Sequence, residues 1–95
     1  MPLSLDEYRC KLITKILFSS SQEEVSRFCD AAIRGLEHHN VNAYIIVRFV
    51  DKVIFKLEEF NPMKKDAQQW ANVKVAKILL RRISGQLQTT SIKHA

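Results

Sequence analysis

The sequence predicts an all-α protein, folded as a compact four-helix bundle with short loops and mostly antiparallel neighbouring helices. The chain has two glycines and two prolines, too few for the turns of a β sandwich or barrel. Apolar residues recur at helical spacing, and residues that favour helix starts precede these segments. An irregular orthogonal packing of the same helices is the alternative arrangement. Four helices are expected, over residues 5–18, 22–39, 43–60 and 62–84.

The first two helices each begin with a capping-box signal. Ser4 is followed three residues later by Glu7, and Ser21 by Glu24. In this motif the hydroxyl and the carboxylate each accept a hydrogen bond from the main-chain N–H of the other residue. The apolar stripe of the second helix is the clearest in the chain and consists of Val25, Phe28, Cys29, Ala32, Ile33 and Leu36.

The third helix is predicted from the spacing of its apolar residues, although its amino-acid composition favours a strand. The segment 44–55 is rich in β-branched and aromatic residues, which favour strands. Its apolar residues nevertheless fall on one arc at 100° per residue, whereas a two-residue period would mix them with the charged ones. They are Ile46, Val47, Phe49, Val50, Val53, Ile54, Leu57 and Phe60. Asn40 and Asn42 are both candidates to end the second helix or to cap the third.

Asn61 followed by Pro62 predicts the start of the fourth helix, and Gly85 predicts its end. Residues 1–85 are therefore expected to form one domain, and residues 86–95 a frayed polar tail. The expected core face of the fourth helix is Ala71, Val75, Ala76, Ile78, Leu79 and Ile83, with Val73 and Leu80 beyond it.

Positive charge is concentrated in the last third of the chain. Residues 62–95 carry a net charge of +6, whereas residues 1–61 carry −1. A basic segment of this kind suits an anionic partner such as nucleic acid. Trp70, Lys74, Lys77 and Arg81 share one stripe of the fourth helix, and Arg82 adjoins it, a pattern suited to base stacking with phosphate neutralisation. The alternative is that Trp70 packs on another helix and the cations only solvate an outer face.

Two aromatic residues lie on the polar side of the third helix. Tyr44, Arg48, Asp51 and Phe55 form a stripe there at i, i+4, i+7 and i+11. Large aromatic residues away from the main apolar arc indicate a second contact surface. That surface is either another helix of this chain or a partner, which could be a second copy.

Catalytic and metal sites are not expected. The sequence has no phosphate-binding loop, metalloprotease motif or nucleophile elbow, and we expect no enzyme, cofactor or metal. Neighbouring histidines His38 and His39 point about 100° apart on a helix and suit a helix C-terminus better than a metal. Cys10 and Cys29 could face each other across the first helical hairpin, but each is more typical of a small apolar side chain.

The chain start lacks the basic and apolar regions of a signal peptide, and its longest apolar run, residues 43–47, is too short to cross a bilayer. The amphipathic fourth helix is needed to close the core, so a membrane-surface role is not expected. The sequence thus predicts a cytoplasmic protein-interaction domain, self-associating or binding another protein, with Tyr44, Phe55 and Trp70 as anchors. Nucleic-acid binding through Trp70, Lys74, Lys77, Arg81 and Arg82 is the alternative.

Overall fold

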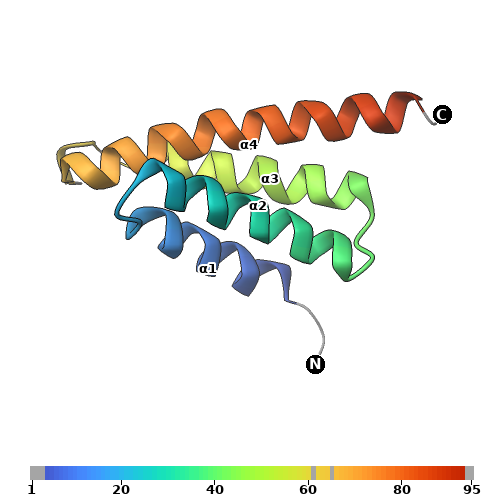
Figure 1. Ribbon diagram of the computed structural model, residues 1–95, viewed down its shortest axis with the longest axis horizontal. Helices are drawn as coiled ribbons and strands as arrows, with labels where there is room; N and C mark the ends of the chain where they lie inside the picture. The colour runs from blue at the N-terminus through green and yellow to red at the C-terminus, as the bar shows by residue number, and fades with distance from the viewer. Residues whose placement is uncertain (1–3, 61, 65, 94–95) are drawn as a thin grey trace.

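Four α-helices and one short 3-10 helix follow one another in the computed structural model, which describes residues 4–60, 62–64 and 66–93 (Figure 1). The α-helices are α1 (Leu5–Leu17), α2 (Gln22–His38), α3 (Ala43–Glu58) and α4 (Ala67–Lys93), and the 3-10 helix η1 is Pro62–Lys64. The described residues include no strand. The predicted all-α four-helix fold is therefore confirmed.

Consecutive helices run in opposite directions, so the α1–α2 and α3–α4 connections lie at one end of the molecule and the α2–α3 connection at the other (Figure 1). The long helix α4 lies along one side of the other three and extends past them at its C-terminal end. Short connections make this antiparallel arrangement the natural one.

The core is apolar and receives side chains from all four helices. Each fully buried aliphatic side chain contributes about 1.5–3 kcal/mol through removal of its apolar surface from water. Its innermost aliphatic members are Ile16, Val25, Leu36, Ile46, Val50, Val53, Leu57, Val73 and Leu80.

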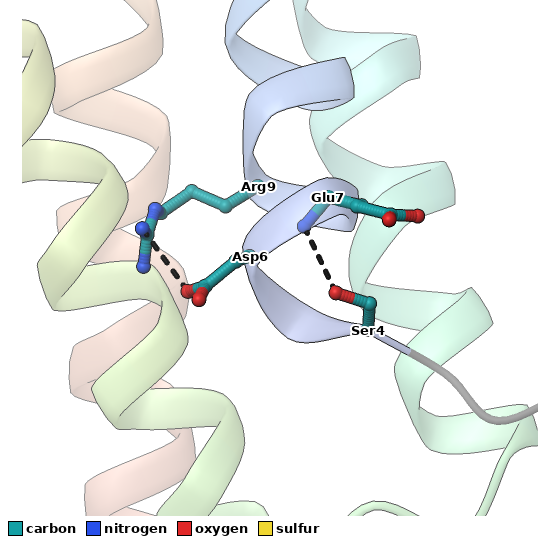
Figure 2. A network of polar contacts seen from close by, with 4 residues as sticks. All are labelled: Ser4, Asp6, Glu7 and Arg9. Carbon is teal, nitrogen blue, oxygen red and sulfur yellow. Dashed lines mark hydrogen bonds and ion pairs between the residues drawn. The ribbon is translucent and has the colours of Figure 1, made fainter.

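Both predicted capping serines accept the expected hydrogen bond. The Ser4 hydroxyl accepts from the Glu7 main-chain N–H at 3.4 Å, as Figure 2 shows, and Ser21 accepts from that of Glu24 at 3.2 Å. The Glu24 carboxylate, however, returns to Ser20 and accepts from both its N–H and its hydroxyl, at 2.6 and 2.7 Å. These two donors hold the pKa of Glu24 below its usual value.

The α2–α3 connection uses both asparagines. Asn40 has a left-handed backbone (φ 60°), and the N–H groups of Asn40 and Val41 donate to the main-chain oxygens of Glu37 and Leu36. This is a Schellman ending, which satisfies carbonyl oxygens left free at a helix C-terminus. Asn42 then caps α3, with its side-chain oxygen accepting from the Tyr44 N–H at 2.7 Å.

The predicted bounds of the fourth helix were wrong at both ends. Pro62 begins η1 instead of α4, and Asn61 lies outside the described residues. The Asp66 carboxylate accepts from the Gln69 N–H at 2.7 Å, so Asp66 provides the side-chain cap just before α4 begins at Ala67. Gly85 does not stop the helix, which continues to Lys93, because an interior glycine costs only about 1 kcal/mol and Leu87 packs against the core beyond it.

The predicted core face of α4 was right for Ala76 but wrong in its overall orientation. Val73, Ala76 and Leu80 are fully buried, whereas Ile78 is 58% exposed. Val75, Leu79 and Ile83 are only partly buried at the edge of the core. The buried face also carries the polar residues Asn72 and Ser84. The true buried face of α4 is therefore rotated about the helix axis from the one that apolar spacing predicts.

Candidate protein-interaction site

The outer face of α3 presents two aromatic rings to solvent. Tyr44 is 67% exposed and Phe55 68% exposed, while the opposite side of α3 supplies seven buried residues to the core. Arg48 and Asp51 lie between the two rings and are also exposed. Tyr44 and Phe55 are eleven positions apart, which corresponds to about 16 Å along the helix axis. We call Tyr44, Arg48, Asp51 and Phe55 the α3 stripe.

A groove between α1 and α3 runs beside Phe55. It has a volume of about 520 Å³, with walls formed by Asp6, Arg9, Asp51, Lys52, Phe55, Lys56 and Glu59. Arg9 pairs with Asp6 at 3.1 Å, and its guanidinium points toward α3 (Figure 2). A second hollow of about 260 Å³ shares Asp6, Arg9 and Lys52 and reaches Ile45, which is 43% exposed.

The third predicted anchor has a different environment. Trp70 is partly buried and packs against the core from α4. The ammonium groups of Lys74 and Lys77 lie 5.7 and 5.9 Å from the centroid of its ring, within cation–π range. The structure thus brings together the indole and two cations of the predicted basic stripe.

The remaining cations of α4 differ in their partners. Arg81 pairs with Glu58 of α3 at 3.2 Å, which neutralises one charge of the basic stripe. Lys74 and Arg82 are exposed and Lys77 is half-buried. Within the described part of the chain, these three residues form no salt bridge. Ile78 lies among them as an exposed apolar side chain.

Possible metal ligands and the two cysteine thiols are spread apart in the described ranges. No cluster of three or more His, Cys, Asp or Glu side chains there could hold a metal ion. Cys10 is exposed and Cys29 is buried, and the two thiols are unbridged. Burial, with a smaller contribution from the Asp30 charge, raises the pKa of Cys29 to about 12, so this thiol is a poor nucleophile.

No helix in the described part of the chain is long and apolar enough to span a membrane.

His38 and His39 lie at the C-terminal end of α2, with ring centroids 6.1 Å apart in an edge-on arrangement.

Sequence reasoning missed the α1 side of the groove. Asp6 and Arg9 were indistinguishable from other helix-surface charges, and nothing local shows that α1 and α3 leave space between them. The exposure of Ile45 and Ile78 was missed too, because both fall close to the apolar arcs of their helices. A three-residue spacing between Asp6 and Arg9 is the one local signal, since it permits an ion pair on α1.

Comparisons with protein-family models, with curated proteins and with solved structures found no significant match to this chain.

Proposed function

We propose that this protein is a non-enzymatic protein-interaction domain whose contact surface is the outer face of α3. The observation that carries the proposal is the exposure of Tyr44 and Phe55, each about two-thirds accessible to solvent. Exposed aromatic side chains leave apolar area in water, and burial in a partner recovers that free energy.

The composition of this face favours a protein partner. Tyrosine, phenylalanine and arginine are enriched where proteins bind one another, and aromatic anchors gain most when a neighbouring pocket accepts a side chain in return. Phe55 forms part of the wall of the 520 Å³ groove, so a partner side chain can enter beside the ring.

A cytoplasmic location is part of the proposal. Its support is that the two cysteines remain unbridged, one exposed and one buried. Exposed free thiols are typical of proteins in reducing compartments.

The test compares a double variant, Tyr44→Ser with Phe55→Ser, with a matched control, Phe18→Ser. Phe18 is 73% exposed, but it follows α1 at the end of the molecule where the α1–α2 connection lies. Both variants should keep the helical circular dichroism spectrum and melt within a few degrees of the wild type, since exposed rings contribute little to stability. Affinity capture with the tagged protein should retain partners on the wild type and Phe18→Ser and lose them on the double variant.

Equal retention by all three proteins would contradict the proposed surface. Unfolding of the double variant would show that the two rings belong to the core, which would also contradict it.

Nucleic-acid binding by α4 is the second candidate function. It is favoured by Lys74, Lys77 and Arg82, three cations within about two and a half turns that have no salt-bridge partner in the described structure. Because Lys74 and Lys77 already lie close to the indole, the expected contact is phosphate neutralisation without base stacking on Trp70.

This candidate is tested by titration with a mixed-sequence oligonucleotide while Trp70 fluorescence is recorded at several salt concentrations. Binding should weaken steeply with salt and should be lost in Lys77→Glu with Arg82→Glu. The control is Lys11→Glu with Arg34→Glu, which changes the net charge equally on exposed residues of α1 and α2. Equal weakening by both pairs would show that only net charge matters and would contradict a site on α4.

A further inference from the structure

The α3 stripe is complementary to its own reverse order. From its N-terminal end it presents an aromatic ring, a cation, an anion and a second aromatic ring, in Tyr44, Arg48, Asp51 and Phe55. The midpoint between the two rings coincides with the midpoint between the two charges, between residues 49 and 50. A stripe with this symmetry is complementary to a second copy of itself turned end over end.

The spacing of the stripe also suits helix pairing. Steps of four, three and four residues match the a and d positions of a heptad, so all four residues fall within an arc of about 60° on one helix face. In an antiparallel pair, an a position of one helix packs opposite a d position of the other. Tyr44 then meets Phe55 of the second copy, and Arg48 meets its Asp51.

Charge selects between the two possible orientations. In a parallel pair, identical positions face each other, so Arg48 would meet a second arginine and Asp51 a second aspartate. Like charges facing each other disfavour that orientation. In the antiparallel pair both contacts join opposite charges, and a two-fold axis repeats the set, as in an isologous dimer.

Among the described residues, Arg48 and Asp51 have no ion-pair partner. Arg48 and Asp51 are exposed, and in the part of the chain that the structure describes neither forms a salt bridge, although their spacing on α3 permits one. Two other charges of α3 are paired, Lys56 with Glu59 and Glu58 with Arg81, whereas Lys52 forms no salt bridge among the described residues. The two charges on the α3 stripe therefore remain available to a second molecule.

We propose that the protein forms a two-fold symmetric dimer through antiparallel pairing of α3 with α3 of a second copy. This inference rests on the proposed protein-interaction function of the same face and names its partner. Four side chains per helix form a contact at the small end of specific interfaces, so we expect a dissociation constant on the order of 10–100 µM.

The experiment is sedimentation equilibrium of the full chain over a concentration series from about 5 to 500 µM, which brackets that affinity. The variants are Arg48→Asp, Asp51→Arg and the double swap that carries both changes. Each single change places like charges opposite each other at two symmetric contacts and should weaken dimerisation at least about tenfold. The double swap restores opposite charges at both contacts and should dimerise like the wild type.

Mixing the two single variants gives a further test. One variant presents two aspartates and the other two arginines, so a heterodimer has opposite charges at both contacts, and dimers should reappear on mixing. Circular dichroism melts of each variant establish that it is folded, and Phe18→Ser serves as a control that should dimerise normally.

The possible outcomes separate this inference from the function on which it rests. Single variants that dimerise like the wild type, or a double swap that fails to recover, would overturn the antiparallel pairing. A wild type that stays monomeric at about 500 µM would overturn the second copy as partner. The proposed protein-interaction function of α3 would still stand if the Tyr44 and Phe55 double variant no longer captured another protein that the wild type captures. It would be overturned if the double variant captured that protein equally well.

Discussion

The side-chain amide of Asn72 in α4 donates a hydrogen bond to the main-chain oxygen of Ser19, 2.8 Å away and 53 residues earlier in the chain. The same nitrogen lies 3.4 Å from the oxygen of Leu17, the last residue of α1. Carbonyl oxygens at a helix C-terminus lack donors within the helix. Asn72 therefore completes the end of α1 from another helix and fixes how the two pack.

Asn72→Ala should lower the free energy of unfolding by about 2–3 kcal/mol, because it leaves buried carbonyl oxygens without a donor and opens a small cavity. The control is Gln68→Ala. Gln68 is exposed and donates to the Asn72 side-chain oxygen at 2.9 Å, so its loss should cost less than about 1 kcal/mol. Urea denaturation measures both values, and equal losses would contradict the role assigned to Asn72.

Local signals predicted the first three helices well. Ser4, Ser21 and Asn42 all cap helices with their side chains, as their positions suggested. Such contacts involve neighbours in sequence, so the residues needed to predict them are adjacent in the chain. The return contact of Glu24 to Ser20 instead of Ser21 is a detail of loop geometry that the motif does not specify.

Helix α4 was predicted poorly because its orientation depends on long-range contacts. Asn72 is buried where α4 meets the end of α1, and Val73 and Leu80 are buried with it, whereas Ile78 is exposed. Apolar spacing alone supported a different face, since α4 has apolar residues around most of its circumference.

The orientation of α4 is tested by two similar truncations on opposite faces. Leu80→Ala removes a fully buried side chain and should cost about 2–5 kcal/mol. Ile78→Ala removes one that is 58% exposed and should cost less than about 1 kcal/mol. Guanidinium denaturation of both variants measures the difference, and a larger loss for Ile78→Ala would restore the face predicted from sequence.

Gly35 permits the close approach of α2 to α1. The Tyr8 hydroxyl donates to the Ala32 main-chain oxygen at 3.0 Å, and a Cβ at position 35 would overlap that hydroxyl. Gly35→Ala should therefore destabilise the protein by about 1–2 kcal/mol, although alanine is the better helix former by about 1 kcal/mol. In a Tyr8→Phe background the overlapping atom is absent, and the same change should become neutral or stabilising.

The matched control for this prediction is Gly85→Ala. Nothing lies within 4 Å of a Cβ built at Gly85 in α4, so this change should stabilise the protein by about 0.5–1 kcal/mol through helix propensity. Thermal melts are compared for Gly35→Ala, Gly85→Ala, Tyr8→Phe and the double variant that combines Tyr8→Phe with Gly35→Ala. Destabilisation by Gly35→Ala that persists without the Tyr8 hydroxyl would place the obstacle elsewhere.

The candidate site was partly predictable. The stripe from Tyr44 to Phe55 lay opposite the apolar arc of α3, and the structure leaves both rings exposed. Trp70 occupied a similar position in the pattern of α4, yet it packs on the core, because the true buried face of α4 lies closer to it than expected. The groove wall from α1 required the packing of two helices and had no local signal beyond the spacing of Asp6 and Arg9.

The buried thiol of Cys29 makes stability depend on alkaline pH. Its pKa is raised from 9.0 to about 12, chiefly by burial, so the folded protein keeps this proton when an unfolded chain loses it. Because the pKa of Cys29 is higher in the folded protein than in the unfolded chain, the thiol contributes stability below about pH 9. That contribution is lost as the pH rises toward 12. The free energy of unfolding should fall through this window by up to about 1.4 kcal/mol per pH unit from this group.

Urea denaturation of the wild type, Cys29→Ala and Cys10→Ala at pH 8 to about 11 measures this dependence. Cys29→Ala should be less stable at pH 8, because it leaves a cavity, and should show a shallower decline above pH 9. The raised pKa of Tyr8 adds a decline of the same sign at higher pH in all three proteins, so the comparison isolates the thiol. Cys10 is exposed, and Cys10→Ala is the control for removal of a thiol outside the core. Parallel slopes for Cys29→Ala and the wild type would show that the thiol does not titrate differently on folding, and the burial that protects it would then be incomplete in solution.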